Sequence, residues 1–134
     1  MYKRQLYTNA MISHFVQNYD PSCKRCEHAG LCPAPKETVL HIFWDCPCIL
    51  VILNDVRRLI SNEPITDIKL REILFLGSDE NLKFSIKMTN KICLASLFFI
   101  FSTRNNKSVY SKEKLIKFIN INTNDIISFF PLYP

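Results

Sequence analysis

Four residues in the first third of the chain have the types and the spacing of metal ligands. Cys23 and Cys26 form a C-x2-C pair, and His41 and Cys46 form an H-x4-C pair. Thiolate sulfur and imidazole nitrogen are the ligands that zinc takes in closed, tetrahedral structural sites. The spacing therefore predicts one structural Zn²⁺ ion held by these four side chains, with no coordination position left open for water.

Other cysteine and histidine residues leave alternatives to this ligand set. His28, Cys32 and Cys48 lie close enough in the sequence to replace one ligand or to bind a second ion. Cys93 stands within the apolar run Ile92–Phe101 and is expected to be a buried thiol. A Cys/His hydrolase would need a thiol and an imidazole free of metal, and nothing in the sequence orients Cys32 and His28 for that chemistry. We therefore expect no catalytic residues and no enzyme.

Six cysteines in 134 residues could instead form disulfides, but three features oppose that interpretation. Tyr2–Met11 lacks the apolar segment of a secretory signal, all the cysteines except Cys93 lie within residues 23–48, and His41 stands among them. We expect an intracellular, reducing compartment, with nucleus or cytoplasm left open. No membrane partner is expected either, because the longest apolar stretch, Ile92–Phe101, is about half of the ~20 residues that a membrane helix needs.

The elements that must position these ligands are predicted to be helices. Apolar residues recur at helical spacing, Thr66 and Ser111 are suited to cap two of the runs, and Ser78 or Asp79 is expected to open the longest one. The predicted helices span residues 3–18, 37–45, 48–60, 67–75, 80–104, 112–120 and 124–130. Residues 22–36 contain Gly30 and two prolines, so we predict an irregular loop that the metal holds in place.

The expected fold class is all-α, a small multi-helix domain with a CCHC zinc knuckle in its N-terminal third. Hydrophobic residues make up 48% of the chain, which supplies a core, and only two glycines occur, which argues against a glycine-rich phosphate loop. A shift in composition near residues 62–66 predicts a zinc-binding region over 1–62 and a helical C-terminal region over 63–134 that packs on it.

The residues around the predicted ligands resemble those of a known family. The C-x2-C pair is followed by Glu37-Thr38-x2-His41-x-Phe43-Trp44-x-Cys46-Pro47, and later by Asn54-Asp55-Val56 and Ile73-Leu74-Phe75-Leu76-Gly77. This pattern resembles the zinc-binding C-terminal region that follows the polymerase in LINE-type (non-LTR) retrotransposon reverse transcriptases. The segment Tyr7–Asp20 and a long helix ending at Arg104 are also similar, so the resemblance covers residues 5–120.

The resemblance implies a module without catalysis of its own. In the family, polymerisation belongs to an upstream domain with paired aspartates, and no Asp-Asp pair occurs in this chain. The resemblance further implies contact with template RNA or target DNA. Whether a polymerase domain acts in trans as a further partner is left open. No small-molecule substrate is expected.

The charge of the chain is compatible with a nucleic-acid partner. The net charge is +5, with five Lys/Arg against two Asp/Glu in residues 1–36, two against four in 37–66, and ten against six in 67–134. The candidate phosphate contacts are Lys24 and Arg25 inside the C-x2-C turn, and Lys83, Lys87 and Lys91 at i, i+4 and i+8 on one helix face. These residues would alternatively form only a solvated surface.

Two questions of function stay open at this point. Phe15, Phe43 and Trp44 are able to stack on bases, but we expect them to pack in the core. The module would alternatively dock on a protein through its apolar helix at Ile92–Phe101, or be a translated remnant of a retroelement with no activity.

Overall fold

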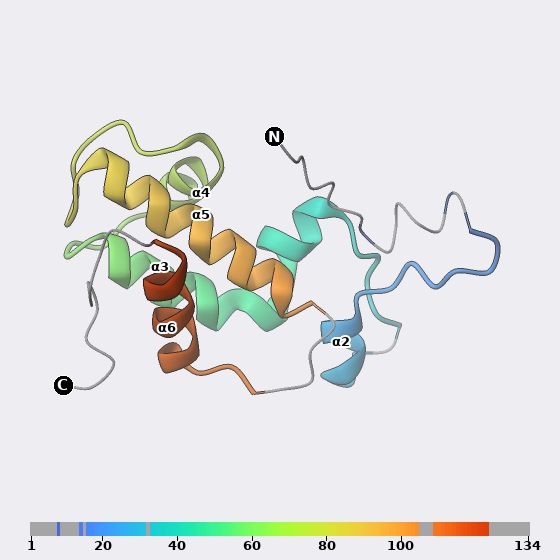
Figure 1. Cartoon of the computed structure of the whole chain (residues 1–134). Helices are drawn as coiled ribbons and strands as arrows, with labels where there is room; N and C mark the ends of the chain where they lie inside the picture. Colours follow the sequence, from blue (N-terminus) through green and yellow to red (C-terminus); the bar gives the residue numbers. More distant parts are fainter. Residues whose placement is uncertain (1–7, 9–13, 15, 32, 105–108, 124–134) are drawn as a thin grey trace, which may run out of the picture.

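The chain folds into a mostly helical arrangement, shown by a computed structural model that describes residues 8, 14, 16–31, 33–104 and 109–123 (Figure 1). Within those residues there is no β-strand, and one isolated antiparallel bridge joins Ser22 and Lys36. The elements are α2 (Lys24–His28), a π-helical turn η1 (His41–Asp45), a 3-10 turn η2 (Pro47–Ile49), α3 (Leu50–Ile60), α4 (Asp67–Leu76), α5 (Ile86–Ser102) and α6 (Lys112–Asn122). The predicted helical class is therefore confirmed.

Side-chain caps set the start of α4 and α6. The hydroxyl of Thr66 accepts a hydrogen bond from the backbone N–H of Lys69, and the hydroxyl of Ser111 accepts one from Lys114. Each cap satisfies one of the N–H groups that a helix leaves unpaired at its N-terminus. Both caps were predicted from the sequence, and α4 and α6 begin at the residue after each of them.

The start of the longest helix was predicted wrongly. Residues 80–84 do not continue α5, which begins at Ile86 after a cap by the Ser85 hydroxyl. The backbone N–H of Lys83 donates instead to the carbonyl of Ile60 at the end of α3. In this segment Leu82 and Phe84 pack against the core.

Helix α5 organises the core. It contacts α3, α4, α6 and η1, and in Figure 1 it runs through the middle of the molecule with its C-terminal end close to α2. Ile92 and Ile100 of α5, Ile60 of α3 and Leu115 of α6 are among the buried residues of one apolar cluster. This cluster includes residues from both sides of residue 62, so the packing itself marks no boundary between 1–62 and 63–134.

The N-terminal third differs in detail from the prediction. The predicted irregular loop at 22–36 contains the short helix α2, and the helix predicted at 37–45 is a turn that widens into η1. The helices predicted at 3–18 and 124–130 fall largely or wholly outside the described residues. Among the helices that are described, none has the length and apolar character needed to cross a membrane.

Candidate metal centre

Cys23 and Cys26 are positioned by a short helix in a loop that two backbone hydrogen bonds close. Cys23 precedes α2, and Cys26 lies one turn further on. The loop is closed by the backbone N–H of Cys23, which donates to the carbonyl of Pro35 at 2.8 Å, and by that of Glu37, which donates to Pro21 at 2.8 Å. These bonds hold a segment that has little apolar side chain to bury.

His41 and Cys46 are brought together by the π-helical turn η1. The backbone N–H of Cys46 donates to the carbonyl of His41 at 2.9 Å, which is an i→i+5 bond. In an α-helix, with 3.6 residues per turn, residue i+5 would lie about 140° around the axis from residue i. The wider π turn brings it closer to the side of residue i, and the His41 and Cys46 ligand atoms lie within 4.8 Å of each other. Pro47 follows directly and begins η2, where the chain changes direction.

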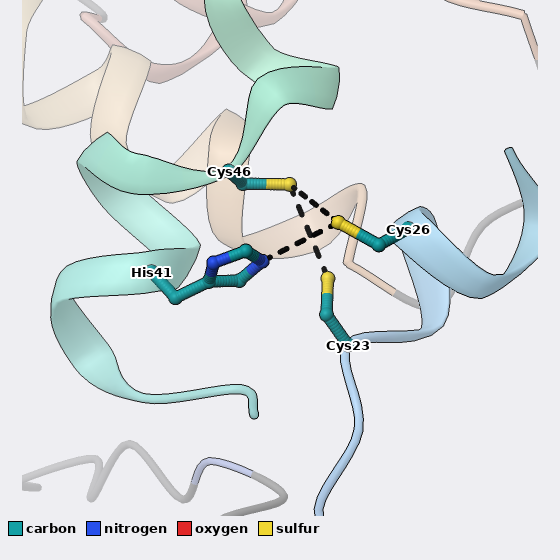
Figure 2. Close-up of side chains that lie close together, drawn as sticks. All are labelled: Cys23, Cys26, His41 and Cys46. Atoms are coloured by element: carbon teal, nitrogen blue, oxygen red, sulfur yellow. Dashed lines mark hydrogen bonds between the residues drawn. The ribbon is translucent and has the colours of Figure 1, made fainter. Parts of the chain in front are cut away.

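The four predicted ligands lie close together and could bind a metal ion (Figure 2). Their ligand atoms all lie within 4.8 Å of one another, and the side chains point toward a common centre. The Sγ of Cys26 lies 3.5 Å from His41 Nε2 and 3.6 Å from Cys46 Sγ, which in turn lies 4.0 Å from Cys23 Sγ. Separations of this size let all four side chains reach one metal ion placed between them.

Burial and hydrogen bonds among the side chains shift the pKa values of the three thiols. All four side chains are buried. A hydrogen bond from Cys46 lowers the pKa of Cys23 to about 4, whereas burial raises the pKa of Cys26 to about 12. The pKa of Cys46 is raised by its hydrogen bond to Cys23 and by burial, with the positive charge of Arg25 acting in the opposite direction. Without a cation, one thiolate is stabilised by its neighbouring thiols, and a divalent ion is what would allow three thiolates together.

Comparisons with protein-family models, with curated proteins and with solved structures gave no match. The resemblance to LINE-type reverse transcriptases therefore rests on the residues of this chain alone.

The alternative ligands lie outside the cluster wherever the structure describes them. Cys48 is half-buried and His28 is exposed, and neither joins the group of four. Cys93 is buried in α5, where burial raises its pKa to about 12. Cys32 lies outside the described residues, so its part in the site stays a prediction.

The two basic residues of the C-x2-C turn point in different directions. Lys24 is at the surface, where its Nζ pairs with Asp20 at 2.9 Å and with Glu27 at 3.0 Å, and both bonds raise its pKa. Arg25 was predicted as a phosphate contact, but it is 7% exposed and turned inward. Its guanidinium donates to backbone carbonyls of η1 and α5, so it is not presented to a nucleic acid.

The predicted lysine stripe is broken by the late start of α5. Lys83 precedes the helix and lies with its Nζ 5.7 Å from the centre of the Phe84 ring. Lys87 is exposed and Lys91 is half-buried on the helix itself. The two helical lysines share a face, but Lys83 does not extend it.

The aromatic residues of the ligand string pack against neighbouring helices. Phe43 is buried and stacks on Phe101, with ring centres 6.1 Å apart. Trp44 is half-buried, with its ring edge-on to Phe75 and the guanidinium of Arg71 5.8 Å from its centre. Phe15 lies outside the described residues.

A buried ion pair near the site was not predicted. Glu37 is fully buried, and its Oε1 lies 3.4 Å from Nη1 of Arg104, just beyond α5. The guanidinium of Arg104 also lies 4.8 Å from the centre of the Phe101 ring. The sequence places Glu37 four residues before His41, but nothing local indicates a partner 67 residues away.

Proposed function

We propose that the chain is a zinc-stabilised, non-catalytic accessory module. The observation that carries this proposal is the buried group of three sulfurs and one nitrogen within 4.8 Å. Three thiolates and one imidazole favour Zn²⁺ over the harder divalent ions, which prefer oxygen ligands. Cys23, Cys26, His41 and Cys46 would fill all four positions, so the ion would be structural.

The test is the metal content of protein purified without added metal. We expect about one zinc per chain by elemental mass spectrometry, and its loss in a His41→Ala, Cys46→Ala double variant. Cys48→Ser is the matched control, because Cys48 is a half-buried thiol outside the cluster and its loss should leave the zinc in place. A folded wild-type protein without zinc would contradict the proposal.

The partner that we propose for the module is template RNA or target DNA. The support is the resemblance to the LINE-type C-terminal region and the net charge of +5. The proposed phosphate contacts are Lys24, Lys83, Lys87 and Lys91, and Arg25 is no longer among them. Lys24 and Lys91 are the weaker members, since Lys24 is already paired with two carboxylates and Lys91 is half-buried.

Salt dependence tests this assignment directly. Zinc-loaded protein should bind single-stranded RNA or DNA with an affinity that falls steeply as salt rises. Replacing Lys83 and Lys87 with Gln should reduce the slope of log affinity against log salt by about 1 for each lysine. Lys112→Gln, an exposed lysine on α6, should leave the slope unchanged. Absence of binding to either nucleic acid at low salt would contradict the assignment.

A second candidate function is docking on a protein, favoured by an apolar groove between η1, α4 and α5. Two adjoining hollows of about 530 and 230 Å³ share Val39 and Phe75. Leu76 and Leu94, which line them, are 84% and 56% exposed. Single exposed apolar residues are ordinary, but a contiguous apolar surface is typical of an interaction site.

The occupant that we propose for this groove is an apolar segment of a polymerase domain supplied in trans, because a polymerase domain precedes this region in the family that the chain resembles. Leu94→Glu and Phe98→Glu should abolish such binding without changing zinc content, because both side chains are exposed on the groove side of α5. Val109→Glu is the control, an exposed apolar residue outside the groove. Binding that survives both groove variants would contradict docking at this surface.

A further inference from the structure

Arg25 is a buried cation held beside the metal ligands. It stands between Cys23 and Cys26 in α2. Its Nη2 donates to the carbonyl of Ile42 at 2.7 Å, and its Nη1 donates to the carbonyl of Ile100 at 3.2 Å and to Thr103 Oγ1 at 3.1 Å. All three acceptors are neutral, and Nε is buried with no hydrogen-bond acceptor in the structure.

No carboxylate forms an ion pair with Arg25 in the part of the chain that the structure describes. Every ion pair found there joins other residues, and the fully buried Glu37 pairs with Arg104 instead. Burying a charge without a counter-charge is strongly unfavourable, so a guanidinium in this position calls for an anion nearby. The groups beside it that would become negative are the thiols of Cys23 and Cys26 on the same turn of chain, and its Nη2 reaches the carbonyl of Ile42, the neighbour of His41.

The charge of the proposed zinc centre matches this requirement. Three thiolates, a neutral imidazole and one divalent ion leave a single surplus negative charge. A site with two thiolates and two imidazoles would be neutral and would leave Arg25 unbalanced. Each of the two buried charges therefore stabilises the other.

We propose that Arg25 is the counter-charge of the metal centre, raising its zinc affinity and favouring three thiolate ligands over two. This inference rests on the proposed zinc site. The alternative role for Arg25 is purely structural, because its hydrogen bonds also tie α2 to η1 and to the end of α5.

Two pairs of variants separate these roles. In the natural ligand set, Arg25→Met should weaken zinc binding by about 10- to 100-fold, the range found when groups around a metal's ligands are removed. Arg25→Lys keeps the charge. Its loss of zinc affinity, expressed as a logarithm, should be less than about a third of the loss in Arg25→Met. In a Cys46→His background the zinc-loaded site is neutral, and Arg25→Met should there change the affinity by less than about threefold.

The measurement is a competition titration of zinc against a chelating dye at fixed pH. Cobalt spectra of the same proteins report the number of thiolates through the sulfur-to-cobalt charge-transfer band. Arg58→Met controls for net charge, because Arg58 is exposed on α3. Equal losses for Arg25→Met and Arg25→Lys, or equal losses in both ligand backgrounds, would overturn the counter-charge role. Wild-type protein that binds neither zinc nor cobalt would overturn the metal site as well, so the two failures are distinguishable.

Discussion

A partly buried hydrogen bond between Tyr110 and Asp55 provides a quantitative test of the fold. The hydroxyl of Tyr110 donates to Oδ2 of Asp55 at 2.6 Å, which joins α3 to the segment that leads into α6. Asp55 is buried, and the Tyr110 ring packs edge-on against Phe99. A hydrogen bond to a charged group contributes about 1.5–3 kcal/mol, and removing the donor leaves the carboxylate short of a partner.

We expect Tyr110→Phe to lower the free energy of unfolding by about 2 kcal/mol, because it keeps the ring and removes only the donor. For a chain of this size that corresponds to a fall in Tm of about 6–10 °C. Urea unfolding followed by circular dichroism, with calorimetry alongside, measures both quantities. Asp55→Ala removes the acceptor and completes a double-mutant cycle, in which we expect a coupling energy of about 1.5 kcal/mol. A coupling near zero, with Tyr110→Phe within about 0.5 kcal/mol of wild type, would refute the reasoning.

The same bond predicts a pH dependence of stability. Burial, and then the hydrogen bond to Asp55, raise the pKa of Tyr110 above its ordinary value. The folded protein therefore keeps the phenol proton after the unfolded chain has lost it at about pH 10. The stabilisation by Tyr110 is complete below pH 10 and is lost as the pH rises above that value. The stability difference between wild type and Tyr110→Phe should shrink between pH 9.5 and 11, and a difference that grows over this range would show the sign to be wrong.

Three other perturbations have defined outcomes. Chelation of the metal should remove hydrogen-exchange protection from residues 20–46 while α3 to α6 keep theirs, and uniform loss of protection would contradict a local role for the ion. Arg104→Met should destabilise the fold by about 3 kcal/mol in urea unfolding, because it removes the cation that pairs with the buried carboxylate of Glu37. Adding Glu37→Gln should recover part of that loss. Gly77→Ala should reduce the free energy of unfolding by about 1–3 kcal/mol, since Gly77 has φ 93° and ψ 157°, a region that is essentially restricted to glycine; an unchanged Tm would show that α4 ends differently.

The features that sequence alone predicted are those set by local chemistry. Thr66 and Ser111 cap the helices that follow them because a hydroxyl on an extended residue at a helix start reaches the free N–H three residues on. The four candidate ligands could be grouped from sequence because a C-x2-C pair fits one turn of chain and a proline directly after Cys46 marks the end of the turn that carries His41. Their mutual approach in space follows from the closed loop between Ser22 and Lys36.

The features that sequence missed depend on distant partners. Arg25 turns inward because the carbonyls at the end of α5 and in η1 accept its hydrogen bonds, and no local pattern indicates that contact. The start of α5 was misplaced because helical spacing continues through residues 80–85, whereas the backbone there bonds to Ile60 of α3. In both cases a contact between residues far apart in sequence overrides a local preference.

The position of the candidate metal centre links the two functions proposed for the chain. Between His41 and Cys46 lie Ile42 and Phe43, which are buried in the core, and Phe43 also lines the apolar groove. An ion that fixes the two ligands would therefore fix one wall of the groove as well. Loss of partner binding after chelation would follow from either function and would not distinguish them. The salt slope would distinguish them, because phosphate contacts weaken steeply with salt while burial of an apolar groove does not.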